Sequence, residues 1–175
     1  MASVLDKLVD NQGSSYKSNS WYRNNVKKIY DKATARKLMN QGKLIGRPSV
    51  GRLNLFFYDP KTKDRLPYYD RFPLVFIIEL YEDGFLGMNF HYLPYNLRAR
   101  LLEELDNRNF RRNYSQLKRI KLIRPTIKRY LRAHYRSGFM RLEKDDYIPA
   151  IFMPVAKFEK ASESKVFADS RRMVS

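Results

Sequence analysis

The 175-residue sequence contains no cysteine, which excludes a disulfide framework and cysteine-ligated metal sites. It has two histidines: His91, between aromatic residues, is interpreted as a core residue, and His134 as an ordinary helix position. No apolar run approaches the roughly 18 residues that a membrane-spanning helix needs. Residues 1–12 include acids and lack a long apolar core, so no secretory signal is expected. These absences predict a protein of the reducing cytosol, or of a particle assembled there, without a membrane partner.

The sequence also lacks the motifs of common enzymes, since GxSxG, HExxH, GxGxxG and the phosphate-binding GxxxxGKS or GxxxxGKT are all missing. A metal-dependent nuclease would need several acids that converge on a core strand, commonly with a lysine nearby. The central candidates are Asp70, Glu79, Glu82 and Asp83. Asp83 is explained by a turn, and no lysine stands two positions after Glu79. We therefore expect no enzyme activity, no catalytic residue, no metal, no cofactor and no small-molecule substrate.

Positive charge dominates what is present, because 35 lysines and arginines outnumber 18 acidic residues and give a net charge of +17. Charge of this size attracts polyanions, foremost nucleic acid. The charge is segregated: residues 107–142 hold twelve basic residues and no acid, and residues 16–53 hold ten basic residues and one acid. Residues 59–83, in contrast, hold six acids and four bases. The sequence thus predicts separate basic surfaces on either side of a nearly neutral middle.

The segment 51–92 is expected to form a small curled antiparallel sheet or partial barrel. Residues 52–59 alternate in polarity, with Leu53, Leu55 and Phe57 on one side, which is typical of a strand with one buried face. The aromatic residues of this region are interpreted as core and sheet packing rather than as base-stacking groups.

The second part of that segment predicts a hairpin. Residues 74–78 form a continuous apolar run, as in a strand covered on both faces. Asp83-Gly84 predicts a type I′ turn, and residues 85–92 form the partner strand. One face of that strand, which we call the lean face, carries few large apolar side chains. Another group is therefore expected to pack closely or reach in there. This face carries Gly87, Asn89 and His91.

Three helices are expected around the sheet, at residues 21–40, 95–106 and 126–136. The second carries leucines spaced four apart, which indicates one buried stripe. Pro125 and Ser137-Gly138 are taken as the start and stop signals of the third helix. On that helix, basic residues spaced four apart would form a single ridge. The ridge consists of Lys128, Arg132 and Arg136.

The ends of the chain are expected to be arms. Residues 1–20 are interpreted as a helical arm with a Gly/Ser-rich linker, and residues 21–158 as one α+β domain. Within the domain, about 148–153 is expected to add a strand. Residues 159–175 are expected to form an extended polar tail that becomes ordered against a partner through Val166-Phe167.

Candidate functional residues follow from the basic segments and from one stiff loop. Arginines and lysines at this density suit phosphate contact without base specificity, although pairing with an acidic neighbouring subunit would explain them equally. The expected contacts to double-stranded DNA are Arg108, Arg111, Arg112, Lys118, Arg119, Lys128, Arg129, Arg132 and Arg136, with Arg23, Lys27 and Lys28 assisting. The loop at 67–73 has proline at both ends and is expected to dock on a partner protein. The expected protein-interface residues are Tyr68, Tyr69, Val166 and Phe167.

The stretch from FFYDPKTKDRLPYYDRFPLVFIIELYEDGF to GMNFHYLPYNLRARLL, continued in RPTIKRYL and PAIFMPVAKFEKAS, resembles a family of small virion proteins of T4-like tailed phages, notably marine cyanophages. The resemblance covers roughly residues 45–170. It implies a DNA end protector, which sits on the terminus of the packaged genome and shields it from host exonuclease. It implies other phage structural proteins as partners, and it implies no catalytic residues.

The sequence therefore predicts an α+β fold with flanking helices, an N-terminal helical arm and an extended C-terminal tail. The expected function is that of a non-enzymatic virion protein, assembled in the host cytoplasm, that binds the packaged DNA terminus. One alternative is a structural subunit of the baseplate, neck or tail hub, held by protein contacts. A weaker alternative is a head-completion nuclease.

Overall fold

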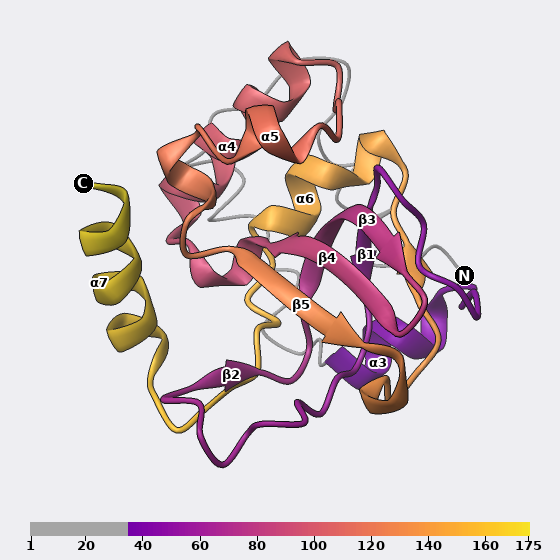
Figure 1. Cartoon of the computed structure of the whole chain (residues 1–175). Coiled ribbons are helices and arrows are strands. Elements are labelled where there is room, and N and C mark those ends of the chain that lie inside the picture. The colour runs from indigo at the N-terminus through magenta and orange to yellow at the C-terminus, as the bar shows by residue number, and fades with distance from the viewer. Residues whose placement is uncertain (1–34) are drawn as a thin grey trace.

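In the computed structural model, which describes residues 35–175, an open five-stranded antiparallel sheet lies at the centre of the fold (Figure 1). Its strand order is β5-β4-β3-β1-β6. The strands are β1 Leu53–Leu55, β3 Leu74–Tyr81, β4 Gly84–Asn89, β5 Ile127–Leu131 and β6 Met140–Arg141. A separate two-stranded sheet pairs β2 Tyr69–Asp70 with β7 Phe158–Glu159. The predicted α+β class with an antiparallel sheet is confirmed. The predicted N-terminal arm lies outside the described residues.

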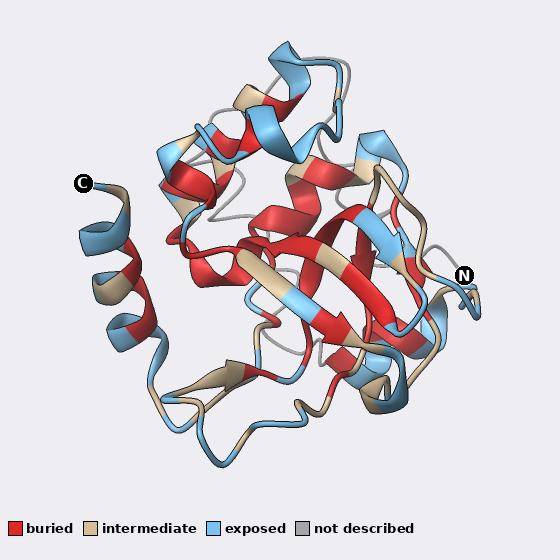
Figure 2. Cartoon of the chain, viewed as in Figure 1, coloured by how far each residue is buried: buried red, intermediate tan, exposed pale blue. Residues whose placement is uncertain are grey.

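Helices cover one face of the main sheet. They are α3 Ala35–Gln41, α4 Tyr95–Asn107 and α6 Tyr147–Ile151. The leucine stripe of α4, Leu97, Leu101 and Leu105, is buried against this face, which confirms the helix predicted at 95–106. The opposite face carries a smaller aromatic core around Phe56 and Phe85, whose rings lie 5.7 Å apart. Both faces of the sheet therefore carry buried side chains, and most of β3 and β4 is buried (Figure 2).

The β3–β4 hairpin forms as expected, and its apolar strand is buried on both faces. Leu74, Phe76 and Ile78 point to the helices, while Val75 and Ile77 point to the aromatic core. The turn residues, however, are Glu82 and Asp83, and neither has a positive φ. The predicted type I′ turn at Asp83-Gly84 is therefore wrong, because Gly84 already pairs with Tyr81.

Gly84 has a reason of its own for being glycine. A Cβ at this position would lie 1.8 Å from the backbone oxygen of Tyr130 on β5. The neighbouring strand thus approaches too closely for any side chain. The sequence feature that predicted a turn in fact permits the contact between β4 and β5.

The segment 52–59 differs from its prediction, because it is buried on both faces. Leu53 and Leu55 face the helices as expected, but Phe56 and Tyr58 pack in the aromatic core instead of facing solvent. The regular strand is also short and ends at Leu55. Alternation indicated the two faces correctly, but it could not show that the second face is covered by segments distant in the sequence.

The helix predicted at 126–136 is wrong, because this segment forms β5 and the 3₁₀ turn η3 Arg132–His134. All five residues of β5 pair with β4, from Met88 opposite Ile127 to Gly84 opposite Leu131. This pairing satisfies the backbone groups along the edge of β4, and it outweighs the local helix signals. In a strand, successive side chains alternate between faces, so the predicted basic ridge does not form.

The strand predicted at about 148–153 is also wrong, because η4 Lys144–Asp146 leads into α6. Pro149 is the third residue of α6, in the first turn, where its missing N–H has no intrahelical acceptor to lose. Proline therefore permits a helix here, although it had suggested broken extended chain.

The predicted extended tail is wrong as well, since residues Glu163–Val174 form helix α7 on the flank of the domain (Figure 1). The Ser162 hydroxyl caps this helix by accepting a hydrogen bond from the Lys165 N–H at 3.2 Å. Val166 and Phe167 pack near Tyr92 rather than facing outward. The tail is thus ordered by its own domain.

A buried polar cluster joins the two sheets around Asp70. Its Oδ2 accepts a hydrogen bond from Asn89 Nδ2 at 2.9 Å and lies 2.8 Å from His91 Nδ1. Its Oδ1 accepts from the backbone N–H groups of Phe72 at 2.9 Å and Lys157 at 3.1 Å. The carboxylate therefore reaches into the lean face of residues 85–92, and His91 is a fully buried core residue, as predicted.

The protonation states of this cluster follow from burial. Burial disfavours the imidazolium and lowers the pKa of His91, although the Asp70 charge opposes that effect. Burial also opposes ionisation of Asp70, but His91 and the hydrogen bonds from Asn89 and Phe72 prevail and lower the pKa of Asp70. The pair is an ionised carboxylate with a neutral imidazole that donates its Nδ1–H.

Candidate nucleic-acid interface

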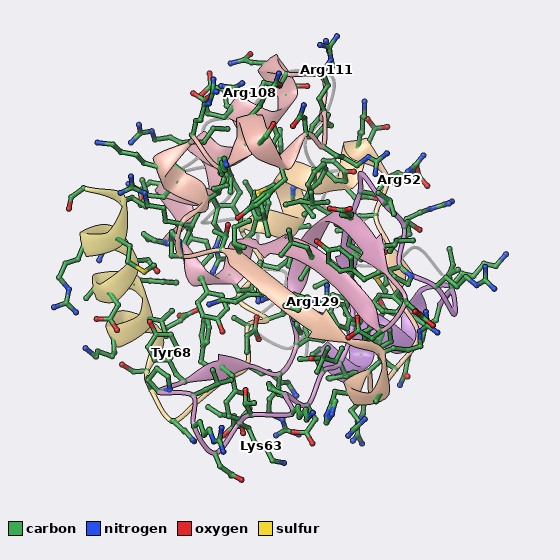
Figure 3. The ribbon with its side chains drawn as sticks, in the orientation of Figure 1. Arg52, Lys63, Tyr68, Arg108, Arg111 and Arg129 are labelled. Carbon is green, nitrogen blue, oxygen red and sulfur yellow. The ribbon has the colours of Figure 1, made fainter. Side chains whose placement is uncertain are left out.

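The structure brings together five of the twelve basic residues predicted to contact DNA. These five are Arg108, Arg111, Arg112, Lys118 and Arg119. They lie on residues 108–124, which run from the end of α4 through α5 Tyr114–Leu117 to η2 Lys121–Ile123. We call this segment the basic lobe. Figure 3 shows Arg108 and Arg111 together on it, away from Arg129 on β5.

The basic lobe begins at an unusual turn. Asn109 and Phe110 have φ angles of 53° and 54°, in the left-handed region that a bulky residue rarely adopts. The Phe110 N–H donates to the Leu105 carbonyl at 2.8 Å, which closes α4. The Phe110 ring packs edge-on against Tyr147 at 5.5 Å. This anchored ring holds the turn in a costly conformation and directs the next residue, Arg111, outward.

Apolar residues hold the rest of the basic lobe on the domain. Leu117 of α5 is buried, as are Leu122 and Ile123 of η2. Asn113 caps α5, because its side-chain oxygen accepts from the Ser115 N–H at 3.1 Å. Since the apolar side chains point inward, the polar and basic residues between them form the outer surface, which is exposed over α5 (Figure 2).

The basic side chains of the lobe are largely free of acidic partners. Among residues 35–175, the one ion pair of this lobe joins Arg108 Nη2 to Glu104 Oε2 at 3.8 Å, on an exposed helix surface. Arg112 Nη1 donates to the Ile78 carbonyl at 3.2 Å. That carbonyl lies where the β3–β4 register shifts, so Arg112 ties the lobe to the sheet. A guanidinium that donates one of its hydrogen bonds to a carbonyl keeps its positive charge and its other donors.

Two further basic residues of the lobe were not among the predicted contacts. Lys121 and Arg124 are exposed, and Arg124 Nη1 donates to the Met173 carbonyl at the end of α7, at 3.4 Å. The signal that could have found them is present, because the whole stretch 107–142 lacks acids. The helix expected after Pro125 led us to extend the predicted basic surface to residues 126–136. Without that helix, the basic surface lies on the N-terminal half of the stretch.

The predicted residues on β5 and η3 are separate from the lobe and mostly engaged. Lys128 is partly buried, with its Nζ 4.1 Å from the centre of the Tyr92 ring, and burial lowers the pKa of its ammonium group. Arg129 pairs with Asp83 and also stacks on an aromatic ring. Arg132 is exposed, and it forms no ion pair with an acid in the described part of the chain.

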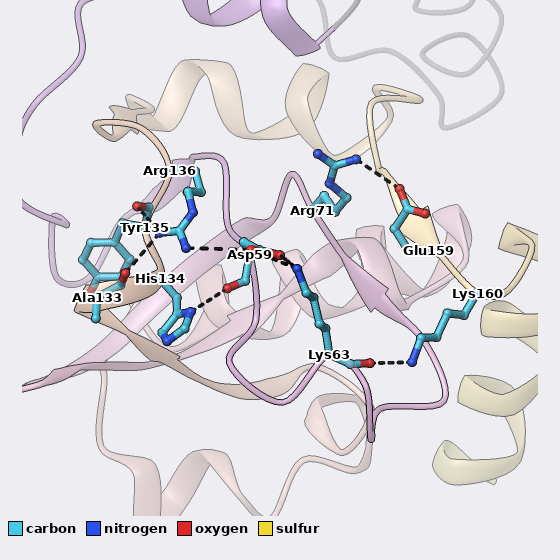
Figure 4. A network of polar contacts seen from close by, with 9 residues as sticks. All are labelled: Asp59, Lys63, Arg71, Ala133, His134, Tyr135, Arg136, Glu159 and Lys160. Atoms are coloured by element: carbon cyan, nitrogen blue, oxygen red, sulfur yellow. Dashed lines mark hydrogen bonds and ion pairs between the residues drawn. The ribbon is translucent and has the colours of Figure 1, made fainter.

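Arg136 belongs to a network around Asp59 (Figure 4). Its Nη2 lies 3.7 Å from Asp59 Oδ2, and Lys63 Nζ lies 3.1 Å from Oδ1 of the same carboxylate. His134 Nδ1 contacts the Asp59 backbone oxygen at 2.9 Å. This network fixes η3 to the loop after residue 58, so Arg136 has a structural partner. Arg23, Lys27 and Lys28 lie outside the described residues.

The predicted protein-interface residues divide between buried and partly exposed positions. Val166 is fully buried and Phe167 is 9% exposed, so both stabilise α7 on its own domain. Tyr68 packs against the same cluster and is partly buried. Tyr69, on β2, is also partly exposed. The docking role of Tyr68 and Tyr69 stays a prediction, while the anchoring role of the other two lies within the chain.

Within residues 35–175, no three acidic or histidine side chains gather where they could hold a metal ion. Nor does any helix of that part have the length and apolarity to cross a membrane. What the basic lobe offers chemically is a set of exposed guanidinium and ammonium groups.

Comparison with known proteins adds one finding. A family model described as Phage T4 terminal DNA protecting protein matches residues 2–174. Searches of curated proteins and of solved structures gave no match. The match covers nearly the whole chain and confirms the resemblance to a DNA end protector.

Proposed function

The chain belongs to the phage T4 terminal DNA protecting protein family, and from this premise we propose that it binds the terminus of packaged double-stranded DNA and shields it from host exonuclease. The family description concerns DNA termini and protection, and it names no catalytic activity. In this proposal the protein is a virion component that is assembled in the infected cell. Its action is steric, because it occupies the DNA end that an exonuclease must engage.

The observation that carries this proposal is the basic lobe. Six of its exposed basic residues form no ion pair with an acid among residues 35–175. They are Arg111, Arg112, Lys118, Arg119, Lys121 and Arg124. Such groups displace condensed counterions from DNA when they contact phosphates, and this release drives binding that does not depend on base sequence. Their support, anchored by buried leucine and isoleucine, keeps the charges together without a rearrangement on binding.

The shape of the lobe also argues for contacts to the DNA backbone. Helices that read base sequence lie in the major groove and present several side chains along one face. The helix of the lobe, α5, spans only Tyr114–Leu117, a single turn. Phosphate contacts position a protein on DNA but carry no sequence information. Binding without sequence preference is what a protein needs if it must act at any genome terminus.

The test is a competition between DNA forms. Labelled blunt-ended duplex is bound by the full-length protein, and unlabelled linear or covalently closed circular DNA of identical sequence is added as competitor. The proposal expects linear DNA to compete better per molecule, with affinity that falls steeply as salt rises. Equal competition by the circle would overturn end binding and would favour the alternative of a baseplate, neck or hub subunit.

A further inference from the structure

Charge alone does not distinguish a DNA end from the middle of a duplex, because phosphates are present in both. Besides its 5′ and 3′ terminal groups, an end differs from the middle in the outer face of the last base pair, which has no stacking neighbour. Aromatic side chains bind such faces in a sequence-tolerant manner. A protein that selects ends by contact would therefore combine free cations with an exposed aromatic ring at one place.

The basic lobe has such a ring in Tyr114. Large hydrophobic residues that are clearly exposed are few within residues 35–175, namely Leu44, Leu80, Tyr114 and Met173. Tyr114 is the aromatic one, with 38% of its surface exposed, and it is the first residue of α5. The cap from Asn113 fixes the start of this helix, so the position of the tyrosine backbone is defined. Arg112 and Arg111 precede it by two and three residues.

Tyr114 lines an open hollow between β3 and the basic lobe. The hollow has a volume of about 600 Å³, and Arg111, Arg112 and Tyr114 line its lobe side. Ile78 and Glu79 of β3 line the opposite side. One wall is therefore cationic and aromatic, whereas the other is apolar with a carboxylate.

This distribution of charge favours phosphates on the lobe side of the hollow and an uncharged group on the β3 side. A phosphate on the β3 side would approach the Glu79 carboxylate, and like charges repel. A base pair is uncharged, so its edge tolerates the carboxylate while its flanking phosphates reach the arginines. Arg112 Nη1 donates to the Ile78 carbonyl at 3.2 Å, which holds one cation in the lining of the hollow.

We propose that this hollow receives the terminal base pair of duplex DNA, with the Tyr114 ring stacked on the last base and Arg111 and Arg112 on its flanking phosphates. The inference rests on the proposed function and gives it a source of end selectivity. An internal base pair is stacked on both sides, so it offers no free face unless the duplex is disrupted at a cost of a few kcal/mol. Tyr114 thus discriminates between linear and closed DNA.

The experiment uses the full-length protein and duplexes with 2-aminopurine as a stacking probe, placed at the terminal or at an internal position. Stacking of an aromatic ring on the probe changes its fluorescence. Wild-type protein is expected to change the terminal signal and leave the internal one nearly constant. Tyr114→Ala is expected to abolish the terminal change and to weaken binding to linear duplex about ten-fold, the scale of one base–aromatic stack.

Two variants serve as controls for this test. Tyr114→Phe keeps the ring and is expected to restore both the terminal signal and the preference for linear DNA. Met173→Ala removes a side chain of similar exposure on α7, outside the hollow, and is expected to behave as wild type. The substituted side chains are exposed, so each variant is expected to retain the fold, and circular dichroism checks that it does.

The outcomes separate this inference from the proposed function. If Tyr114→Ala keeps the preference for linear DNA and the terminal probe signal, Tyr114 does not read the end, while end binding itself stands. If wild-type protein binds linear and circular DNA equally, both are overturned. Loss of the preference in Tyr114→Ala with its return in Tyr114→Phe is the result that supports the stack.

Discussion

If the basic lobe is the DNA-contacting surface, the salt dependence of binding must follow its charges. The slope of log affinity against log salt is about −0.9 per phosphate neutralised on duplex DNA. The lobe has six basic side chains without an ion pair among residues 35–175. If each contacts one phosphate, the slope is about −5.4, and doubling the salt concentration weakens binding about forty-fold.

The perturbation is the triple variant Lys118→Gln, Arg119→Gln and Lys121→Gln. It leaves three of the six basic side chains and brings the slope to about −2.7, so doubling the salt concentration weakens binding only about six-fold. All three side chains are exposed, and none forms an ion pair with an acid within residues 35–175. Their replacement is expected to change the free energy of unfolding by no more than about 0.5 kcal/mol each.

The control triple removes the same net charge from other parts of the protein. Arg52 and Arg141 pair with Glu143 at 2.5 Å and 3.3 Å, and Arg71 pairs with Glu159 at 3.2 Å. Their replacement by glutamine is expected to leave the slope near the wild-type value. The assay is fluorescence anisotropy of a labelled blunt duplex across a salt series. Equal loss of slope in both triples would refute the reasoning, because the field of the whole protein would then govern binding.

Three predictions concern the fold that supports the lobe. Gly84→Ala places a Cβ against the backbone of β5 and is expected to destabilise the protein by about 3 kcal/mol or more in urea unfolding, whereas Gly46→Ala, with no atom near its Cβ, is expected to be nearly neutral. Burial lowers the pKa of His91 below its ordinary 6.5, so the unfolded chain binds that proton more readily and the free energy of unfolding falls as pH drops below about 6.5. The pKa of Asp70 lies below its ordinary 3.8, so its contribution is lost only in stronger acid, and His91→Asn is expected to flatten the dependence between about pH 6.5 and 5. Phe167→Ala is expected to cost about 3 kcal/mol and to make α7 sensitive to limited proteolysis.

Each of these has an outcome that contradicts it. Equal stability of the two glycine variants would show that β4 and β5 do not approach as described. An unchanged pH profile after replacement of His91 would remove the buried imidazole as the titrating group. A resistant C-terminus after loss of the Phe167 ring would indicate that other contacts hold α7.

The elements predicted best from the sequence are those whose signals are both local and repeated. The leucine stripe of α4 specified a helix, and the run at 74–78 specified a strand covered on both faces. The acid-free stretch likewise indicated a basic surface from composition alone. In each case several residues supply the same signal, so one neighbour cannot reverse it.

The wrong predictions concern segments whose conformation is decided by a distant part of the chain. Residues 127–131 have helix boundary signals on both sides, but they pair with the edge of β4 as an antiparallel strand. The burial of Phe56 depends on Phe85 and Phe139, which lie far along the chain. The turn at Phe110 could not be expected either, because a phenylalanine with positive φ is stabilised only by its tertiary contacts. That turn shapes the candidate site, so the site was predicted only as a charged segment.

Exonuclease protection tests the central claim most directly. Linear blunt duplex is saturated with wild-type protein, or with the Lys118, Arg119 and Lys121 triple variant, at low salt, and a processive double-strand exonuclease is added while full-length DNA is followed over time. We expect wild-type protein to preserve the DNA and the triple variant to protect far less at the same concentration. Digestion at the rate of naked DNA in the presence of saturating wild-type protein would contradict the account.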